Sequence, residues 1–121
     1  MKNIPNNTIN YIKFINATKA LRQSLVLTSV DFIEEQLLEN IIINWYSNSP
    51  ITVSETLETV KEISHSTLHR RLKNLRKTGM ITHVADEIDN RIKYIYPTEL
   101  CIEYFNLLSS ASINAVNTAI N

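Results

Sequence analysis

Hydrophobic residues recur every three or four positions through much of the chain, which is the spacing of one face of an α-helix. The first such stretch predicts an amphipathic helix over residues 8–27. A broader apolar stripe predicts a second helix that ends near Tyr46, with Thr28 as its N-cap and Asp31 as the acidic residue of the capping box. The apolar face of the first helix consists of Tyr11, Phe14, Leu21 and Leu25, with Thr18 among them.

The polar segment 47–50 separates these two helices from the next group of elements. It ends in a proline, which disfavours helical geometry in the residue before it, and residues 51–52 are then expected to form a short strand. Thr52 and Glu55 have the spacing of a capping box and predict a short helix that runs to about Lys61. The residues expected to face inward from this helix are Val53, Leu57 and Val60.

Another helix is predicted from His65 to Thr78. Ser64 is its expected N-cap, and Gly79 tolerates the left-handed backbone that is common just past a helix end. A rotation of about 100° per residue divides this helix into two faces. One face carries Leu68, Leu72 and Leu75, whereas the opposite face carries Ser66, Arg70, Lys73 and Lys77, with His69 and Arg76 on its flank. The helix is therefore expected to bury its leucines and to expose its cationic residues.

Two β-favouring segments, residues 80–84 and 92–96, are joined by a polar loop and predict an antiparallel hairpin. Thr98 then caps a last helix, which is expected to extend over residues 98–121. This order of elements is the layout of a winged helix-turn-helix. We therefore expect a mostly α-helical fold with a small β-hairpin wing, of α+β class. The chain is expected to be a single domain, 1–121, whose core at 28–97 is flanked by N- and C-terminal helices used for dimerisation.

Charge is distributed unevenly along the chain. Its 121 residues carry no formal net charge, because twelve Lys and Arg residues balance twelve Asp and Glu residues. Five basic residues and no acidic one lie between Ile63 and Ala85, which leaves seven basic against twelve acidic residues elsewhere. Binding to a nucleic-acid backbone requires such a local basic surface, because neutralising phosphates releases condensed counterions.

The helix that carries this basic segment is therefore expected to bind double-stranded DNA. Short or forked hydrogen-bonding side chains at its start are of the kind that reaches base edges when a helix enters the major groove. These candidate sequence readers are His65, Ser66, Thr67, His69 and Arg70. The candidate DNA contacts of the segment as a whole also include Ser64, Lys73, Arg76 and Lys77.

The chain resembles the MarR family of bacterial winged-helix regulators over about residues 28–98. The resemblance is carried by Ile63-Ser64-His65-Ser66-Thr67-Leu68-His69-Arg70-Arg71-Leu72, Leu75, Gly79-Met80-Ile81 and Asp89-Asn90-Arg91. It implies a homodimeric transcriptional regulator on a pseudo-palindromic operator, with the recognition helix in the major groove. It also implies a wing arginine in the adjacent minor groove. By position this arginine is Arg91, and the carboxylate of Asp89 can orient it.

Two features qualify what the resemblance implies. Asp86 and Glu87 place negative charge in the wing, where it would repel phosphate if it faced the DNA. The apolar stripes of the first and last helices exceed what a winged-helix core can cover, and a second subunit is the simplest partner for them. The residues expected at the dimer interface are Tyr11, Phe14, Leu21, Leu25, Tyr104 and Leu108.

The same residues have plainer interpretations. The cationic helix face can be a solvated surface without a partner, and Asp89 and Arg91 can form an ordinary salt bridge within a hairpin. The basic face can also dock an acidic protein, in which case the chain would be a protein-interaction module without specific DNA binding. A small-molecule effector is left open.

Other chemistry has little support in the sequence. His65 and His69 lie one helical turn apart with His83 further along, but no cysteine or carboxylate completes a metal-binding set, so no metal or cofactor is expected. Cys101, the only cysteine, fits a reducing compartment, and its position in the first turn of the last helix leaves both a redox role and a packing role open. No motif of an enzyme is present, and without a signal or membrane segment the protein is expected in the cytoplasm.

Overall fold

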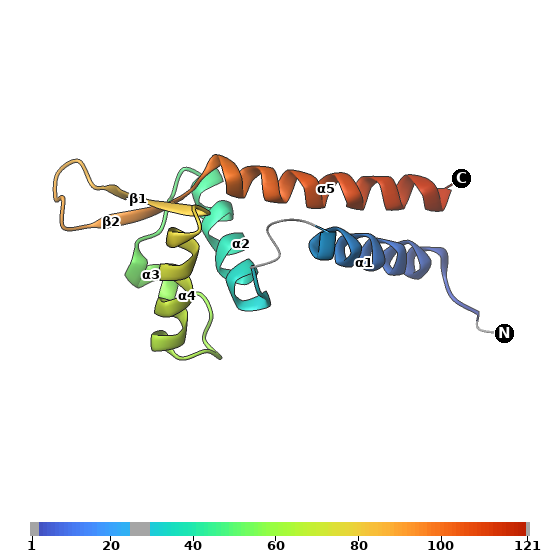
Figure 1. Cartoon of the computed structure of the whole chain (residues 1–121), viewed down its shortest axis with the longest axis horizontal. Coiled ribbons are helices and arrows are strands. Elements are labelled where there is room, and N and C mark those ends of the chain that lie inside the picture. The colour runs from blue at the N-terminus through green and yellow to red at the C-terminus, as the bar shows by residue number, and fades with distance from the viewer. Residues whose placement is uncertain (1–2, 25–29, 121) are drawn as a thin grey trace. The chain divides into compact units, whose positions relative to one another are not determined.

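The computed structural model of the chain describes residues 3–24 and 30–120, and it divides into two compact units (Figure 1). One unit comprises Met1–Ser29 and Glu103–Asn121, and the other comprises Val30–Ile102. The first unit contains helix α1 (Asn6–Ser24) and most of helix α5 (Glu99–Ile120). The second unit contains the remaining elements, which are α2 (Phe32–Tyr46), α3 (Val53–Leu57), α4 (His65–Lys77), β1 (Ile81–Ala85) and β2 (Lys93–Pro97).

The second unit has the helix and hairpin order that the sequence predicted. Strands β1 and β2 are antiparallel and pair His83 with Ile95, and each begins one residue later than predicted. Figure 1 shows that the loop between them extends away from the helices of this unit. The expected strand at residues 51–52 is reduced to a single bridge between Thr52 and Tyr94. This bridge attaches the start of α3 to the hairpin.

Helix α2 begins at Phe32, and its N-cap is Asp31 rather than Thr28, which lies outside the described residues. The backbone N–H of Glu34 donates to Asp31 Oδ1 at 2.8 Å, and the N–H of Asp31 donates to Glu34 Oε1 at 3.1 Å. A capping box needs a side chain at its third helical position that is long enough to reach back to the cap. Glu34 meets this requirement, whereas the shorter Asp31 would not, so the predicted box was placed three residues too early.

Helix α3 begins with the capping box that the sequence predicted. The N–H of Thr52 donates to Glu55 Oε1 at 3.0 Å, and the N–H of Glu55 donates to Thr52 Oγ1 at 3.1 Å. The helix ends at Leu57 instead of near Lys61. Both the N–H and the hydroxyl of Thr59 donate to the carbonyl of Thr56, at 3.1 and 2.7 Å, and these local bonds compete with a further helical turn.

Helix α4 packs against α2, α3 and β1 through the leucine face that the sequence predicted. Its N-cap is Ser64, and it is followed by Gly79 at φ 86°, a left-handed conformation that glycine adopts without steric cost. Two polar contacts also hold α4 to the start of α2. Asn74 Nδ2 donates to Oε2 of the fully buried Glu34 at 2.7 Å, and Arg71 forms an ion pair with Asp31.

The core of the second unit consists of aliphatic side chains from every element of that unit except α3. Its most deeply buried members are Leu37, Leu38, Ile41, Leu68, Leu75, Met80 and Ile95. In the first unit, Thr18, Tyr104 and Leu108 are buried. Among the described residues, no helix combines the length and the apolar character needed to cross a membrane.

Candidate nucleic-acid interface

The two faces of α4 differ sharply in burial. Leu68, Leu72 and Leu75 are 0%, 4% and 1% exposed, so this face belongs to the core. The polar residues on the other side of the helix are all exposed: Ser66, His69, Arg70, Lys73, Arg76 and Lys77. The division that the helical periodicity predicted is therefore confirmed, and α4 presents a continuous cationic surface. The DNA-binding role of these residues stays a prediction.

The first turn of α4 forms its own small hydrogen-bond network. The hydroxyl of Ser64 caps the helix by accepting from the N–H of Thr67 at 3.3 Å, and it donates to Thr67 Oγ1 at 3.0 Å. His65 Nε2 lies 3.3 Å from Glu58 Oε1. The Ser66 hydroxyl also lies 3.3 Å from that of Ser64, so these hydroxyls shape the turn together. The side chains of His65, His69 and Arg70 are exposed.

Arg71 differs from the other basic residues of α4. It is half-buried, and its guanidinium pairs with the carboxylate of Asp31 at the start of α2. The Arg71 charge is therefore paired within the chain and links α4 to the start of α2. Four basic residues of α4 stay on the exposed face, namely Arg70, Lys73, Arg76 and Lys77.

The wing loop is organised by the carboxylate of Asp86. Asp86 Oδ2 accepts from the backbone N–H groups of Ile88 and Asp89 at 3.0 and 2.9 Å, and Oδ1 accepts from the Tyr94 hydroxyl at 3.1 Å. These hydrogen bonds, that from Asp89 above all, hold the pKa of Asp86 below its usual value. The Asp86 carboxylate is therefore hydrogen-bonded within the wing, whereas the neighbouring Glu87 is exposed.

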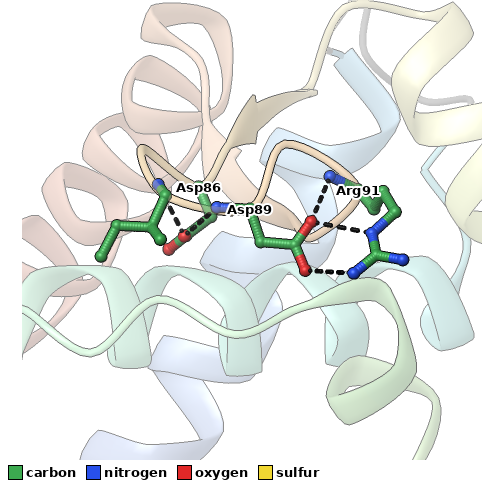
Figure 2. Close-up of polar contacts among 4 residues, drawn as sticks. Asp86, Asp89 and Arg91 are labelled. Atoms are coloured by element: carbon green, nitrogen blue, oxygen red, sulfur yellow. Dashed lines mark hydrogen bonds and ion pairs between the residues drawn. The ribbon is translucent and has the colours of Figure 1, made fainter.

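Arg91 and Asp89 form a two-pronged pair at the end of the same loop (Figure 2). Arg91 Nε donates to Asp89 Oδ1 and Nη2 donates to Oδ2, both at 2.9 Å, and the N–H of Arg91 also donates to Oδ1 at 3.1 Å. The arginine lowers the pKa of the Asp89 carboxyl, and its own pKa is raised in return. The Arg91 side chain is 87% exposed, so this pair lies at the surface of the wing.

A pocket of about 200 Å³ lies beside the exposed face of α4. Its apolar lining residues are Val53 and Leu72, and its other lining residues are His69, Lys73, Arg76 and His83. A second hollow of about 300 Å³ separates the start of α3 from the wing and is lined by Thr52, Val53, Ser54, Arg91, Ile92 and Lys93. Both hollows include Val53, so the surface from α4 to the wing is indented and carries basic side chains along its length.

The residues expected at a dimer interface belong to the first unit. Tyr104 and Leu108 are buried in the chain, and Phe14 and Leu21 are half-buried. Tyr11 is 60% exposed, and its ring centroid lies 5.8 Å from that of Phe14. Leu25 lies outside the described residues. The role of this set in dimerisation stays a prediction.

Several solved structures share this architecture. The transcriptional regulator Tm0710 of Thermotoga maritima matches 93% of this chain and 72% of its own, with a TM-score of 0.70 and 18% identity. A mutant of MepR from Staphylococcus aureus, bound to an oligodeoxyribonucleotide, matches 94% of this chain and 78% of its own, with a TM-score of 0.71 and 18% identity. YusO of Bacillus subtilis matches 90% of this chain and 69% of its own, with a TM-score of 0.58 and 13% identity.

The chain has the winged-helix fold of MarR-family regulators. At these identities the likeness establishes the fold, and it agrees with the resemblance that the sequence carries. No known family profile and no curated protein matches the chain by sequence. In winged-helix terms, α3 and α4 form the helix-turn-helix, and β1, β2 and their loop form the wing.

His83 is the residue of this winged-helix surface that the sequence did not assign to it. Reasoning from the sequence considered His83 only as a metal ligand, whereas the structure places it in the pocket beside Arg76. The signal was present in the alternation of β1, where Ile81 is buried and Thr82 is exposed. A period of two therefore puts His83 on the face of the wing that packs towards the helices.

The other chemical candidates in the chain are its histidines and Cys101. Among the described residues, no group of three or more His, Cys, Asp or Glu side chains is arranged to hold a metal ion. Cys101 is fully buried, and burial raises the pKa of its thiol to about 12. A thiol with this pKa stays protonated and lacks the reactive thiolate that a redox sensor needs.

Proposed function

We propose that the chain is a sequence-specific double-stranded DNA-binding transcriptional regulator that acts as a homodimer. Its α4 enters the major groove, and its wing lies at the minor groove. The observation that carries this proposal is the exposed basic face of α4, which lies opposite three buried leucines. The MepR mutant that shares the fold was solved with an oligodeoxyribonucleotide, which supports the same use of the fold here. The proposal includes no enzymatic activity.

In this proposal the residues of α4 divide into base readers and phosphate contacts. His65, Ser66, His69 and Arg70 lie in the first two turns, where a recognition helix meets base edges. Arginine can bond the O6 and N7 atoms of guanine together, which makes Arg70 the strongest candidate for a specific contact. Lys73, Arg76 and Lys77 lie further along the helix and provide positive charge for the phosphate backbone.

The wing contributes through Arg91 and its orientation by Asp89. A narrow minor groove has an enhanced negative potential that attracts arginine. The two-pronged pair fixes the guanidinium before DNA arrives, which reduces the conformational entropy lost on binding. The Asp86 carboxylate is hydrogen-bonded by donors of the wing itself, whereas Glu87 is exposed and must face away from the phosphates in this arrangement.

The homodimer is proposed from the first unit of the chain. Exposed apolar residues on α1, including Ile9, Tyr11 and Ile12, favour contact with a second copy. Two recognition helices on one side of a duplex must be about 34 Å apart to enter successive major grooves. The operator is therefore expected to be an inverted repeat with half-sites about ten base pairs apart.

Selection from a pool of random duplexes tests this proposal. Full-length protein should enrich an inverted repeat with the expected spacing, and sedimentation should show two chains on each selected duplex. The affinity should fall steeply with salt, because phosphate contacts release counterions. Weak retention without an enriched sequence would instead favour the protein-interaction module, and a single chain bound to each duplex would contradict the homodimer.

A further inference from the structure

The pocket beside α4 is an open depression that is lined by basic and apolar side chains. It is bounded by three elements of the second unit: α3 provides Val53, α4 provides Lys73 and Arg76, and β1 provides His83. His69 of α4 also lines it, and none of its lining residues is acidic. The volume of about 200 Å³ exceeds several times the roughly 30 Å³ that a water molecule occupies in the liquid. The pocket can therefore hold a phosphate group with some of its hydration water.

His83 is the least exposed of the ionisable side chains in this pocket. Burial lowers its pKa from the usual 6.5, and the positive charges of Arg76 and Lys93 lower it further. The groups that face His83 from neighbouring elements are Arg76, Lys73 and His69 on α4 and Lys93 on β2, while α3 contributes the apolar Val53. No carboxylate among them offsets the positive charge, so His83 is mostly neutral at pH 7.

We infer that this pocket receives a backbone phosphate of the bound duplex, and that His83 takes up a proton from solvent when the phosphate enters. The inference rests on the proposed function, and it adds His83 to the DNA contacts and proton uptake to the binding step. Lys73 and Arg76 attract the phosphate, and the phosphate then faces the imidazole of His83. Protonation leaves His83 able to donate a hydrogen bond to a phosphate oxygen through a ring nitrogen that was an acceptor before.

Duplex binding and protonation of His83 should favour each other. In the free protein the surrounding cations disfavour the imidazolium ion, and a phosphate in the pocket replaces part of that repulsion with attraction. The pKa of His83 is therefore higher in the complex than in the free protein. Between the two pKa values the complex holds more protons than the free components, so the affinity for DNA rises as the pH falls. One proton changes the affinity by at most about tenfold per pH unit.

The direct test follows the imidazole of His83 by NMR in the full chain. The pH titration is recorded without DNA and with a saturating duplex, and His83→Gln assigns the resonance. The duplex affinity of the parent and of His83→Gln is measured in parallel at pH 7.5 and pH 6.0. The inference predicts a higher His83 pKa in the complex and an affinity gain on acidification about three- to tenfold larger in the parent than in His83→Gln. A further pH titration of His83 is recorded with inorganic phosphate in place of the duplex.

Each outcome decides something. An unchanged His83 pKa in a complex that forms normally would overturn the inference while leaving the proposed function intact. An equal pH dependence of the duplex affinity in the parent and in His83→Gln would also overturn the inference and leave the proposed function intact. A pKa that rises equally with inorganic phosphate and with duplex would assign the pocket to free phosphate and overturn its role in DNA binding. A chain that binds no duplex at either pH would overturn the proposed function and the inference together.

Discussion

Helix α4 and the wing use their charges in opposite ways. On α4, Arg70, Lys73, Arg76 and Lys77 are exposed on a face without a carboxylate. In the wing, Asp86 and Asp89 accept hydrogen bonds from groups of the wing itself, and the Asp89 carboxylate accepts from both Nε and Nη2 of Arg91. The helix is thus suited to supply affinity for phosphate, whereas the wing is suited to hold one arginine in a fixed direction.

This difference also shows how one short segment serves two purposes. Within α4 the leucines belong to the core, Arg71 and Asn74 bind the start of α2, and the remaining polar residues face outward. Substitutions within a few residues of one another should therefore separate stability from DNA binding. In the wing the hydrogen bonds that orient the arginine also shape the loop, so substitutions there should change the local loop structure together with DNA binding.

The largest expected effect is on stability and comes from the buried face of α4. Leu68 is fully buried, and Leu68→Ala should lower the free energy of unfolding of the second unit by about 2–5 kcal/mol through lost burial and a cavity. Ser66→Ala, on the exposed face of the same helix, should change it by less than about 0.5 kcal/mol. Denaturant titration measures both, and equal midpoints would show that α4 does not pack as described.

The next largest effect is on DNA binding and comes from the exposed face. Arg70→Ala should weaken binding to the selected operator by about 1–3 kcal/mol and relax the preference at one base position, if Arg70 contacts a guanine edge. Its thermal midpoint should match that of the parent, because the side chain is exposed. Quantitative binding assays at moderate salt provide the measurement, and an unchanged affinity would remove Arg70 from the interface.

Substitutions in the wing should have a smaller effect and distinguish an oriented arginine from a simple surface salt bridge. Arg91→Ala should weaken operator binding severalfold. Asp89→Asn should weaken it less, because the arginine remains although its partner loses the negative charge and one of two acceptor oxygens. Neither substitution should change stability measurably, since both side chains are solvent-accessible. If both variants bind like the parent, the pair serves only the hairpin.

The smallest effect is a local loosening of the wing in acid. Asp86 accepts its hydrogen bonds best as a carboxylate, and its pKa lies below the usual 3.8. Its stabilising contribution is therefore present above pH 3.8 and is lost as the pH falls through the lowered pKa. Hydrogen-exchange protection of the Ile88 and Asp89 amides should drop in this range, and in Asp86→Ala it should be low even at pH 5. Amides still protected at pH 2 would contradict this account.

The sequence predicted the parts of this molecule that depend on local periodicity and local hydrogen bonds. The leucine spacing of α4, the Thr52 capping box and the left-handed Gly79 all require only residues within one helical turn of each other. The bond between Asn74 and Glu34 joins residues 40 positions apart, so no local pattern indicates it. The end of α3 was missed because Thr56 and Thr59 form local bonds that compete with the helix.

The candidate site was predicted in its helix and only partly in its wing. Exposure of the basic residues followed from the helical wheel, since the opposite face is leucine-rich. The internal use of Asp86 depends on the path of the loop and on Tyr94 from the other strand, which the sequence pattern alone does not specify. The proximity of His83 to Arg76 likewise depends on how β1 packs against α4.

If the exposed basic face of α4 contacts DNA phosphates as proposed, the loss of one of its lysines should change the salt dependence of duplex binding. The logarithm of duplex affinity is measured against the logarithm of salt concentration for the parent, for Lys73→Ala and for Lys13→Ala, whose lysine is exposed on α1. Lys73→Ala should reduce the slope by about one, the share of a single phosphate contact, while Lys13→Ala should keep the parent slope. A Lys73→Ala slope equal to that of the parent would show that Lys73 makes no phosphate contact.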